Sequence, residues 1–291
     1  MNRPPWRGAT GPAGPAGQWL RRVLGAGPTE ERWTPPANVL CHADLPYGRW
    51  PAQRLDLYAP AAASAAPRPV MVWVHGGGWV AGDKARPAMV QHKVQHWLPR
   101  GWLLVSLNYR LLPRATPVEQ ADDVAQALDV VQRQVHRWGG DAQRVVLMGH
   151  STGAHLAALV LGRRSAQRSP LPPLQAAVLV DTAALDVVGL MRGEHLPLHE
   201  RAFGADPAQW TAASPWHALQ GALPPCLLLH AADRPESAAQ NQAYAERARQ
   251  WGSAVQVQAL ALGHQALNEQ LGQPGEATAA VDGFLQAQGL P

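Results

Sequence analysis

The stretch that decides the fold reads VVLMGHSTGAHLAALVL and spans Val145–Leu161. Its first residues form a short apolar run typical of a buried strand, and Gly153–Leu161 continues as an apolar helical pattern. Between them lies GHSTG, a G-x-S-x-G sequence centred on Ser151. A serine in a sharp turn between strand and helix keeps its hydroxyl exposed, and the flanking glycines let neighbouring backbone approach closely. We therefore predict that Ser151 is a nucleophile.

Short apolar runs alternate with longer helical patterns from Val70 onward, which is typical of a parallel sheet with crossover helices. The predicted strands are Val70–Val74, Leu103–Leu107, Val145–Met148, Ala176–Val180, Leu227–His230 and Val255–Leu260. The predicted helices are Met89–Leu98, Val118–Trp138, Gly153–Leu161, Ser237–Trp251 and Ala277–Gln288. An earlier strand, Leu55–Tyr58, lies outside the parallel run.

Length and composition indicate one folded domain. The chain has 291 residues, 46% of them hydrophobic and 16% charged, which suits a single α/β domain with a large core. Residues 1–28 are rich in Gly, Pro and Ala, so we expect a flexible tail there and a catalytic domain over 29–291.

Composition also argues against several partners. No apolar run approaches the roughly 20 residues that span a bilayer, so we expect no membrane span. The net charge of +4 comes from arginines spread along the chain, so we expect no nucleic-acid partner. Cys41 and Cys226 are the only cysteines, which allows no disulfide framework and no cysteine zinc site. The N-terminus lacks the apolar stretch of a secretory signal, so we expect a cytoplasmic location.

A glycine-rich loop, His75-Gly76-Gly77-Gly78-Trp79, follows the predicted strand Val70–Val74. Glycines there let backbone N–H groups point into a cavity, where they and the N–H of Thr152 can stabilise the anion of a tetrahedral intermediate. The loop lacks the G-x-G-x-x-G pattern and the P-loop lysine of phosphate sites. We expect His75 to brace the loop.

Ser151 needs a general base and an acid that orients the base. In sheets with such a serine turn, the order along the chain is Ser, acid, His. His264 follows the last predicted strand and is the only histidine beyond His230, so we predict it as the base. Asp233 follows the strand Leu227–His230, and we favour it as the acid over the nearby Glu236. Asp181 and Asp186 follow an earlier strand, and we interpret both as structural.

The longest stretch without a clear strand runs from Leu185 to Leu223. Insertions at such a place become lids over the strand ends where ligands bind. Trp210 and Trp216 in this stretch, together with Trp79, are candidates for the substrate pocket, because their flat rings can stack on an aromatic leaving group. The alternative is that these tryptophans pack in the core.

The chain resembles the hormone-sensitive-lipase-like branch of α/β hydrolases, and more closely bacterial carboxylesterases and kynurenine formamidases. The residues that carry the resemblance, which covers Leu55 to the C-terminus, are His75–Trp79, Asn108–Leu111, Trp138–Asp141, Gly149–His155, Asp233 and His264. It implies an α/β-hydrolase fold with a mostly parallel eight-stranded sheet flanked by helices and a short lid insertion. It also implies a triad of Ser151, Asp233 and His264, and an oxyanion hole formed by Gly76, Gly77 and Thr152.

The predicted function is hydrolysis of small carboxylic esters through an acyl-enzyme on Ser151, with no cofactor and no metal. Two alternatives remain. An arylformamidase would cleave an N-formyl group from an aromatic amine with the same residues. A catalytically inactive hydrolase scaffold that binds a ligand or protein would be marked by loss of a triad residue, and all three predicted residues are present.

Overall fold

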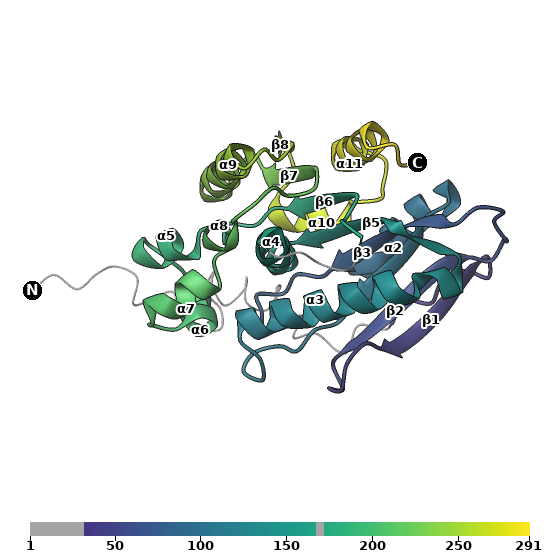
Figure 1. The fold of residues 1–291 in the computed structure, drawn as a ribbon, viewed down its shortest axis with the longest axis horizontal. Coiled ribbons are helices and arrows are strands. Elements are labelled where there is room, and N and C mark those ends of the chain that lie inside the picture. The colour runs from purple at the N-terminus through teal and green to yellow at the C-terminus, as the bar shows by residue number, and fades with distance from the viewer. Residues whose placement is uncertain (1–31, 167–171) are drawn as a thin grey trace, which may run out of the picture.

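The computed structural model describes residues 32–166 and 172–291, and the predicted tail lies outside them. Within this part an eight-stranded sheet runs through the molecule in the order β1-β2-β4-β3-β5-β6-β7-β8 (Figure 1). The strands are β1 (Val39–Pro46), β2 (Arg54–Pro60), β3 (Arg68–Val74), β4 (Leu103–Leu107), β5 (Gly140–His150), β6 (Ala176–Val180), β7 (Cys226–Ala231) and β8 (Val255–Leu260). Strands β3 to β8 pair in parallel with one another. Strand β2 pairs antiparallel with both of its neighbours, β4 and β1.

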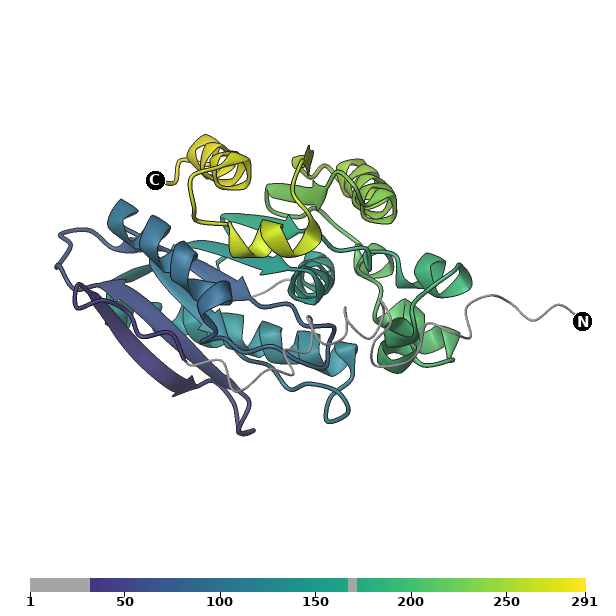
Figure 2. The same ribbon diagram turned by 180° about the vertical axis from the view of Figure 1, so that it is seen from behind.

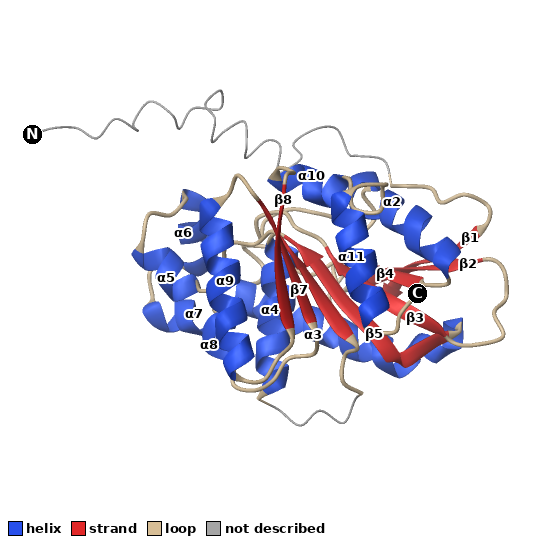
Figure 3. Ribbon diagram, turned by 90° about the horizontal axis from the view of Figure 1, so that it is seen from above, coloured by secondary structure: helices blue, strands red, loops and turns tan. Residues whose placement is uncertain are grey.

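Helices cover both faces of the sheet, as the views from behind and from above show (Figures 2 and 3). Apolar side chains of α3, α4 and α9 pack on one face, and those of α2, α10 and α11 pack on the other. The helices are α2 (Pro87–Trp97), α3 (Pro117–Gln134), α4 (Thr152–Ser165), α9 (Pro235–Gln250), α10 (His264–Glu269) and α11 (Glu276–Ala287), with the 3₁₀ turns η2 (Leu98–Arg100) and η3 (Val135–Trp138). The alternation within β3 fits this double burial, since Val72 faces the first core and Trp73 the second.

The predicted fold class is confirmed. Each predicted strand and helix is also present, and most of their ends differ from the predicted ones by a few residues. Besides the short helices of the insertion between β6 and β7, strand β1 and helix α10 were not predicted. Strand β1 is a half-exposed edge strand whose mixed polar and apolar residues carry no clear alternation. Helix α10 is only one and a half turns long, below the length at which periodicity becomes visible.

Four short helices form an insertion between β6 and β7, inside the predicted lid range. They are α5 (Val187–Arg192), α6 (Pro197–Phe203), α7 (Pro207–Ala212) and α8 (Pro215–Ala218). They gather at one end of the molecule, on the left in Figure 1. The α7–α8 half is firmly attached, because His155 of α4 bonds to the carbonyl of Ala213 and the N–H of Trp216 bonds to the carbonyl of Leu185. A role as a mobile lid stays a prediction.

Among the described helices, none is both long and apolar enough to cross a membrane. The expected cytoplasmic location stays a prediction.

A buried lysine joins α2 to α10. The side chain of Lys93 is fully buried, its ammonium lies 4.3 Å from the centre of the Trp73 ring, and its Nζ donates to the backbone and side-chain oxygens of Asn268 at 2.8 and 3.2 Å. Burial lowers the pKa of Lys93 to about 7, although the charge of Glu269 acts in the opposite direction. This contact holds the short helix that begins with His264.

We predict that Lys93 makes the free energy of unfolding depend on pH. An unfolded lysine titrates near pH 10.4, so between about pH 7 and pH 10 the unfolded chain binds more protons than the folded one and stability rises with pH. Urea denaturation of the wild type and of Lys93→Met across this range should show the wild type gaining on the variant as pH increases. Parallel stability curves would contradict the lowered pKa.

Candidate active site

Ser151 lies in a tight turn between β5 and α4, as the sequence predicts. Its backbone has φ 56° and ψ −121°, a conformation that residues with a side chain rarely adopt. The two flanking glycines are required by space: a Cβ on Gly149 would lie 2.5 Å from the carbonyl oxygen of Gly153, and one on Gly153 would lie 2.1 Å from that of Val74. Nothing larger than glycine fits at either position, so the turn presents Ser151 at the carboxyl end of the sheet.

The glycine loop after β3 runs alongside this turn. A Cβ on Gly76 would lie 3.0 Å from the Cβ of Ser151, and Gly77 has φ 140° with a virtual Cβ 2.0 Å from the carbonyl oxygen of Ala81. His75 is buried, its ring is stacked on Tyr109 at 4.5 Å, and its Nδ1 lies 2.8 Å from the carbonyl oxygen of Gly76. His75 therefore braces the loop, as predicted, and its side chain makes no hydrogen bond to Ser151.

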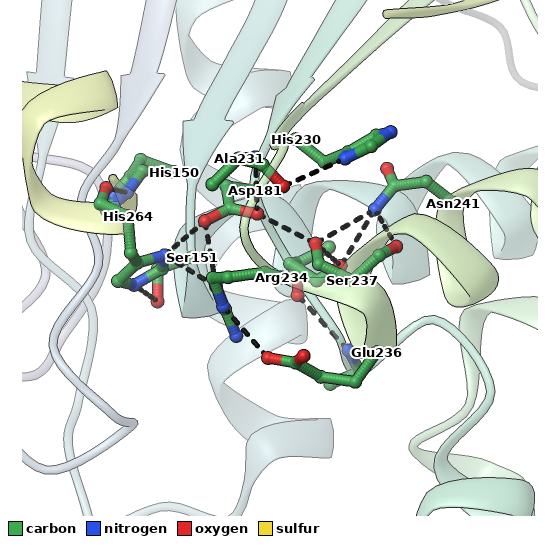
Figure 4. A network of polar contacts seen from close by, with 12 residues as sticks. His150, Ser151, Asp181, His230, Ala231, Arg234, Glu236, Ser237, Asn241 and His264 are labelled. Atoms are coloured by element: carbon green, nitrogen blue, oxygen red, sulfur yellow. Dashed lines mark hydrogen bonds and ion pairs between the residues drawn. The ribbon is translucent and has the colours of Figure 1, made fainter. Parts of the chain in front are cut away.

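His264 reaches Ser151 from the loop that follows β8. It is the first residue of α10, and its Nε2 lies 3.1 Å from the Oγ of Ser151 (Figure 4). For Nε2 to accept the serine proton, the ring proton must reside on Nδ1. The acid that fixes this tautomer must therefore face Nδ1.

The prediction of Asp233 as that acid is wrong for the geometry of this structure. Asp181, which follows β6 directly, places Oδ2 2.6 Å from the Nδ1 of His264. Asp233 lies in the turn between β7 and α9, where its side chain is exposed. Strand β6 is the immediate neighbour of β5 in the sheet and β7 is one strand further away, so a side chain at the end of β6 is closer to the serine. Glu236, the predicted alternative, is also exposed and pairs with Arg234.

Asp181 is fully buried and held on every side. Its Oδ1 accepts from the hydroxyl of Ser237 at 2.7 Å and from the N–H of Ala231 at 3.2 Å, and its Oδ2 accepts from Arg234 at 2.8 Å. Burial alone would raise the pKa of Asp181, but the hydrogen bond and charge of His264, with Arg234 and Ser237, outweigh it and hold that pKa well below its usual value. The carboxylate therefore remains charged and fixed.

Arg234 was not predicted as a site residue, and it lies beside both Asp181 and His264. Its Nη1 lies 2.8 Å from Oδ2 of Asp181 and 2.7 Å from Nδ1 of His264, and its Nε donates to Glu236 at 2.9 Å. A guanidinium only donates, and Nδ1 already donates to Asp181, so the Arg234 hydrogen goes to the carboxylate. Arg234 thus helps to compensate the buried charge of Asp181.

His150 bonds to the backbone of His264. Its Nε2 donates to the backbone carbonyl of His264 at 2.9 Å, and the two ring centres are 4.6 Å apart. Burial lowers the pKa of His150 well below its usual value, and the charge of His264 acts in the same direction. His150 is therefore a neutral donor that fixes the backbone on which His264 is carried.

Above Ser151 opens a cavity of about 620 Å³, within the size range of small-molecule sites. Its walls are formed by the glycine loop, the end of β6 and the α5–α6 part of the insertion. Residues at the wall include Gly76, Gly77, Thr152, Trp79, Leu190, Leu198, His199 and Arg234.

Of the three tryptophans predicted for the pocket, only Trp79 lines this cavity. Trp210 packs against the core and donates from Nε1 to the carbonyl of Gly204. Trp216 lies under the guanidinium of Arg247, with Cζ 4.0 Å from the ring centre. The packing alternative is therefore correct for Trp210 and Trp216. Trp79 is also buried, and it donates to the Nδ1 of His155.

Within residues 32–166 and 172–291, no group of three or more His, Cys, Asp or Glu side chains suits a metal ion. The chemistry of the site is that of a serine activated by a histidine, with a carboxylate behind the histidine and backbone amides beside the serine. The fold and this arrangement define an α/β hydrolase.

Comparison with known proteins agrees with this class. Residues 55–187 match the BD-FAE family. A probable isoprenylcysteine alpha-carbonyl methylesterase of Oryza sativa is 36% identical over 123 residues, which are 42% of this chain and 29% of that protein. Esterase LipQ of Mycobacterium tuberculosis is 30% identical over 231 residues, 73% of this chain and 54% of LipQ. The chain thus spans between about a quarter and about half the length of these relatives.

Solved structures share the fold. Esterase B of Lactobacillus rhamnosis superposes with a TM-score of 0.75 at 20% identity, over 94% of this chain and 90% of that one. A butyrate-bound esterase 2 of Thermogutta terrifontis superposes with a TM-score of 0.65 at 25% identity, over 81% of this chain and 90% of that one. The α/β-hydrolase fold expected from the resemblance is confirmed.

The correction of the acid generates a prediction. Asp181→Asn should lower kcat by a factor on the order of 10⁴, because the amide no longer holds His264 in the productive tautomer. The matched control is Asp233→Asn, which changes an exposed side chain and should leave kcat near the wild-type value. Initial rates on a p-nitrophenyl ester measure both. A large loss in Asp233→Asn with a small one in Asp181→Asn would make Asp233 the acid after all.

Proposed function

We propose that this protein is a serine carboxylesterase that hydrolyses small carboxylic esters through an acyl-enzyme. The observation that carries the proposal is the continuous chain of contacts from the Oγ of Ser151 to Nε2 of His264 and from Nδ1 to the buried carboxylate of Asp181. Ser151 and His264 line a cavity that is also lined by the glycine loop. The positive φ of Ser151 is typical of a nucleophile held in a strand-to-helix turn.

In the proposed mechanism Ser151 attacks the ester carbonyl while His264 takes its proton. The N–H groups of Gly76, Gly77 and Thr152 stabilise the oxyanion of the tetrahedral intermediate. His264 then gives the proton to the leaving alcohol, and the acyl group remains on Ser151. A water molecule, deprotonated by His264, attacks the acyl-enzyme and releases the acid. Asp181 stabilises the imidazolium in both steps without taking its proton.

The names of the relatives support ester hydrolysis. LipQ and LipC of Mycobacterium tuberculosis are named esterases, and LipM is named a probable carboxylic ester hydrolase. These names, like that of the Oryza sativa methylesterase, refer to esters and give the arylformamidase alternative no support. The presence of Ser151, His264 and a buried acid likewise argues against the inactive scaffold.

The first test concerns the nucleophile. Ser151→Ala should reduce turnover by several orders of magnitude while leaving the thermal unfolding curve nearly unchanged. Intact-protein mass spectrometry after treatment with a fluorophosphonate should show a single adduct on the wild type and none on the variant. An adduct on another residue, or an active alanine variant, would refute the proposal.

The second test concerns the acyl group. A long acyl chain gains about 0.8 kcal/mol per methylene only where the methylene is buried, and the α5–α6 wall is short and carries polar as well as apolar side chains. Rates on p-nitrophenyl esters from acetate to palmitate should therefore peak at about two to six carbons, as the butyrate-bound relative suggests. A maximum at about twelve carbons or more would contradict a preference for short chains.

N-formylkynurenine belongs in the same assay. Efficiency on it comparable to that on the best ester would assign the chain to the formamidase alternative with the same triad.

A further inference from the structure

His199 is a residue of the cavity wall that the proposed mechanism does not use. It lies in α6 and lines the cavity above Ser151. Its ring stands edge-on to that of Trp79, with centres 6.0 Å apart, and is stacked on Phe203 at 6.4 Å. A polar ring thus sits among aromatic and aliphatic neighbours.

One hydrogen bond determines the tautomer of His199. The backbone N–H of Leu196, at the start of α6, donates to Nδ1 of His199 at 3.3 Å. A neutral imidazole carries one proton, so with Nδ1 accepting, that proton resides on Nε2. Burial lowers the pKa of His199 to about 4, and the charges of His195 and Arg234 act in the same direction. At neutral pH the side chain is therefore an uncharged donor.

No described residue accepts a hydrogen bond from Nε2 of His199. Across the described residues, the only hydrogen bond of the His199 side chain is the one at Nδ1. Nε2 is also not among the buried polar atoms that lack a partner, so it remains accessible. Since His199 is part of the cavity wall, this N–H is available to a bound molecule.

Two neighbouring donor side chains at this end of the cavity, Arg234 and His195, already face protein groups. Arg234 bonds to Asp181 and Glu236. His195 has its Nδ1 2.9 Å from the carbonyl oxygen of Gly193, and its Nε2 faces Glu200 at 3.7 Å. His199 differs from them because its donor is fixed in direction and unpaired.

We propose that His199 determines substrate specificity by donating from Nε2 to an oxygen of the substrate other than those of the reacting ester. The preferred substrates are then esters that carry an additional ether, hydroxyl or carbonyl oxygen. This inference rests on the proposed esterase function. A purely hydrocarbon substrate that covered His199 would leave the donor without a partner, and an unpaired buried donor is unfavourable.

The test compares isosteric esters that differ by one oxygen. On the acyl side the pair is p-nitrophenyl 3-methoxypropanoate and p-nitrophenyl pentanoate. On the alcohol side it is 2-methoxyethyl butyrate and butyl butyrate. For each pair, the ratio of kcat/KM for the oxygenated ester to that for the hydrocarbon ester is measured in the wild type and in variants, so that differences in intrinsic reactivity cancel.

His199→Phe keeps a ring of similar shape but removes the donor. It should lower the ratio roughly tenfold in at least one pair, the change expected for one lost hydrogen bond. His199→Gln, which retains an N–H donor, should restore part of the ratio. His195→Phe is the matched control, because it removes a histidine whose ring nitrogens already face protein groups, and it should leave both ratios unchanged.

Equal ratios in the wild type and in His199→Phe for both pairs would overturn the inference while leaving the esterase proposal intact. A ratio that falls equally in His195→Phe and is not restored by glutamine would also overturn it, because the effect would then be one of packing. If the wild type hydrolysed none of the esters, the proposed function itself would fail, and the inference with it.

Discussion

The backbone of Ser151 has φ 56°, in a region where an L-residue is strained by about 1–3 kcal/mol, and its surroundings are arranged to hold it there. The N–H of Ser151 donates to the carbonyl of Val180 in β6, and its carbonyl accepts from the N–H of His155 in α4. Gly149 and Gly153 permit the contact between β3, β5 and α4 that closes the turn. The sheet order, which places β5 between β3 and β6, brings the glycine loop to one side of the serine and Asp181 to the other. A change that relaxed this turn would move Oγ away from both.

The second constraint is a buried negative charge. Asp181 has no solvent contact, and burying an isolated carboxylate is strongly unfavourable unless it is paired and hydrogen-bonded. Here Arg234, Ser237 and the N–H of Ala231 occupy its oxygens together with His264. Both Arg234 and Ser237 come from the segment after β7, where the acid was expected. That segment therefore still serves the histidine, but by stabilising the acid instead of supplying it.

The replacement of Asp233 by Asp181 as the acid shows what the sequence could and could not predict. The serine turn, the glycine loop and His264 follow from local patterns, because each depends on residues that are adjacent in the chain. The choice between Asp181 and Asp233 does not. Each aspartate follows a buried strand that ends at the same edge of the sheet, and the decision depends on which side chain turns inward. Arg234 gave no signal for this choice, because the acidic residues Asp233 and Glu236 beside it in the chain account for a cation there, and it does pair with Glu236.

Strand β1 and the two lid tryptophans were missed or misplaced for a related reason. β1 is stabilised by its register with β2 and has little periodicity of its own.

Trp210 and Trp216 lie in the α7–α8 half of the insertion, which is attached to the body through Ala213, Leu185 and Arg247. The α5–α6 half instead supplies the cavity wall, with Leu190, Leu198 and His199. The insertion thus consists of an anchoring part, α7–α8, and a part that lines the cavity, α5–α6. His155 links the anchoring part to α4, and Trp79 links α4 to the glycine loop. The rings of His199 and Phe203 in α6 pack against Trp79, so a change of side chain on the α5–α6 wall is transmitted to the glycine loop through that tryptophan.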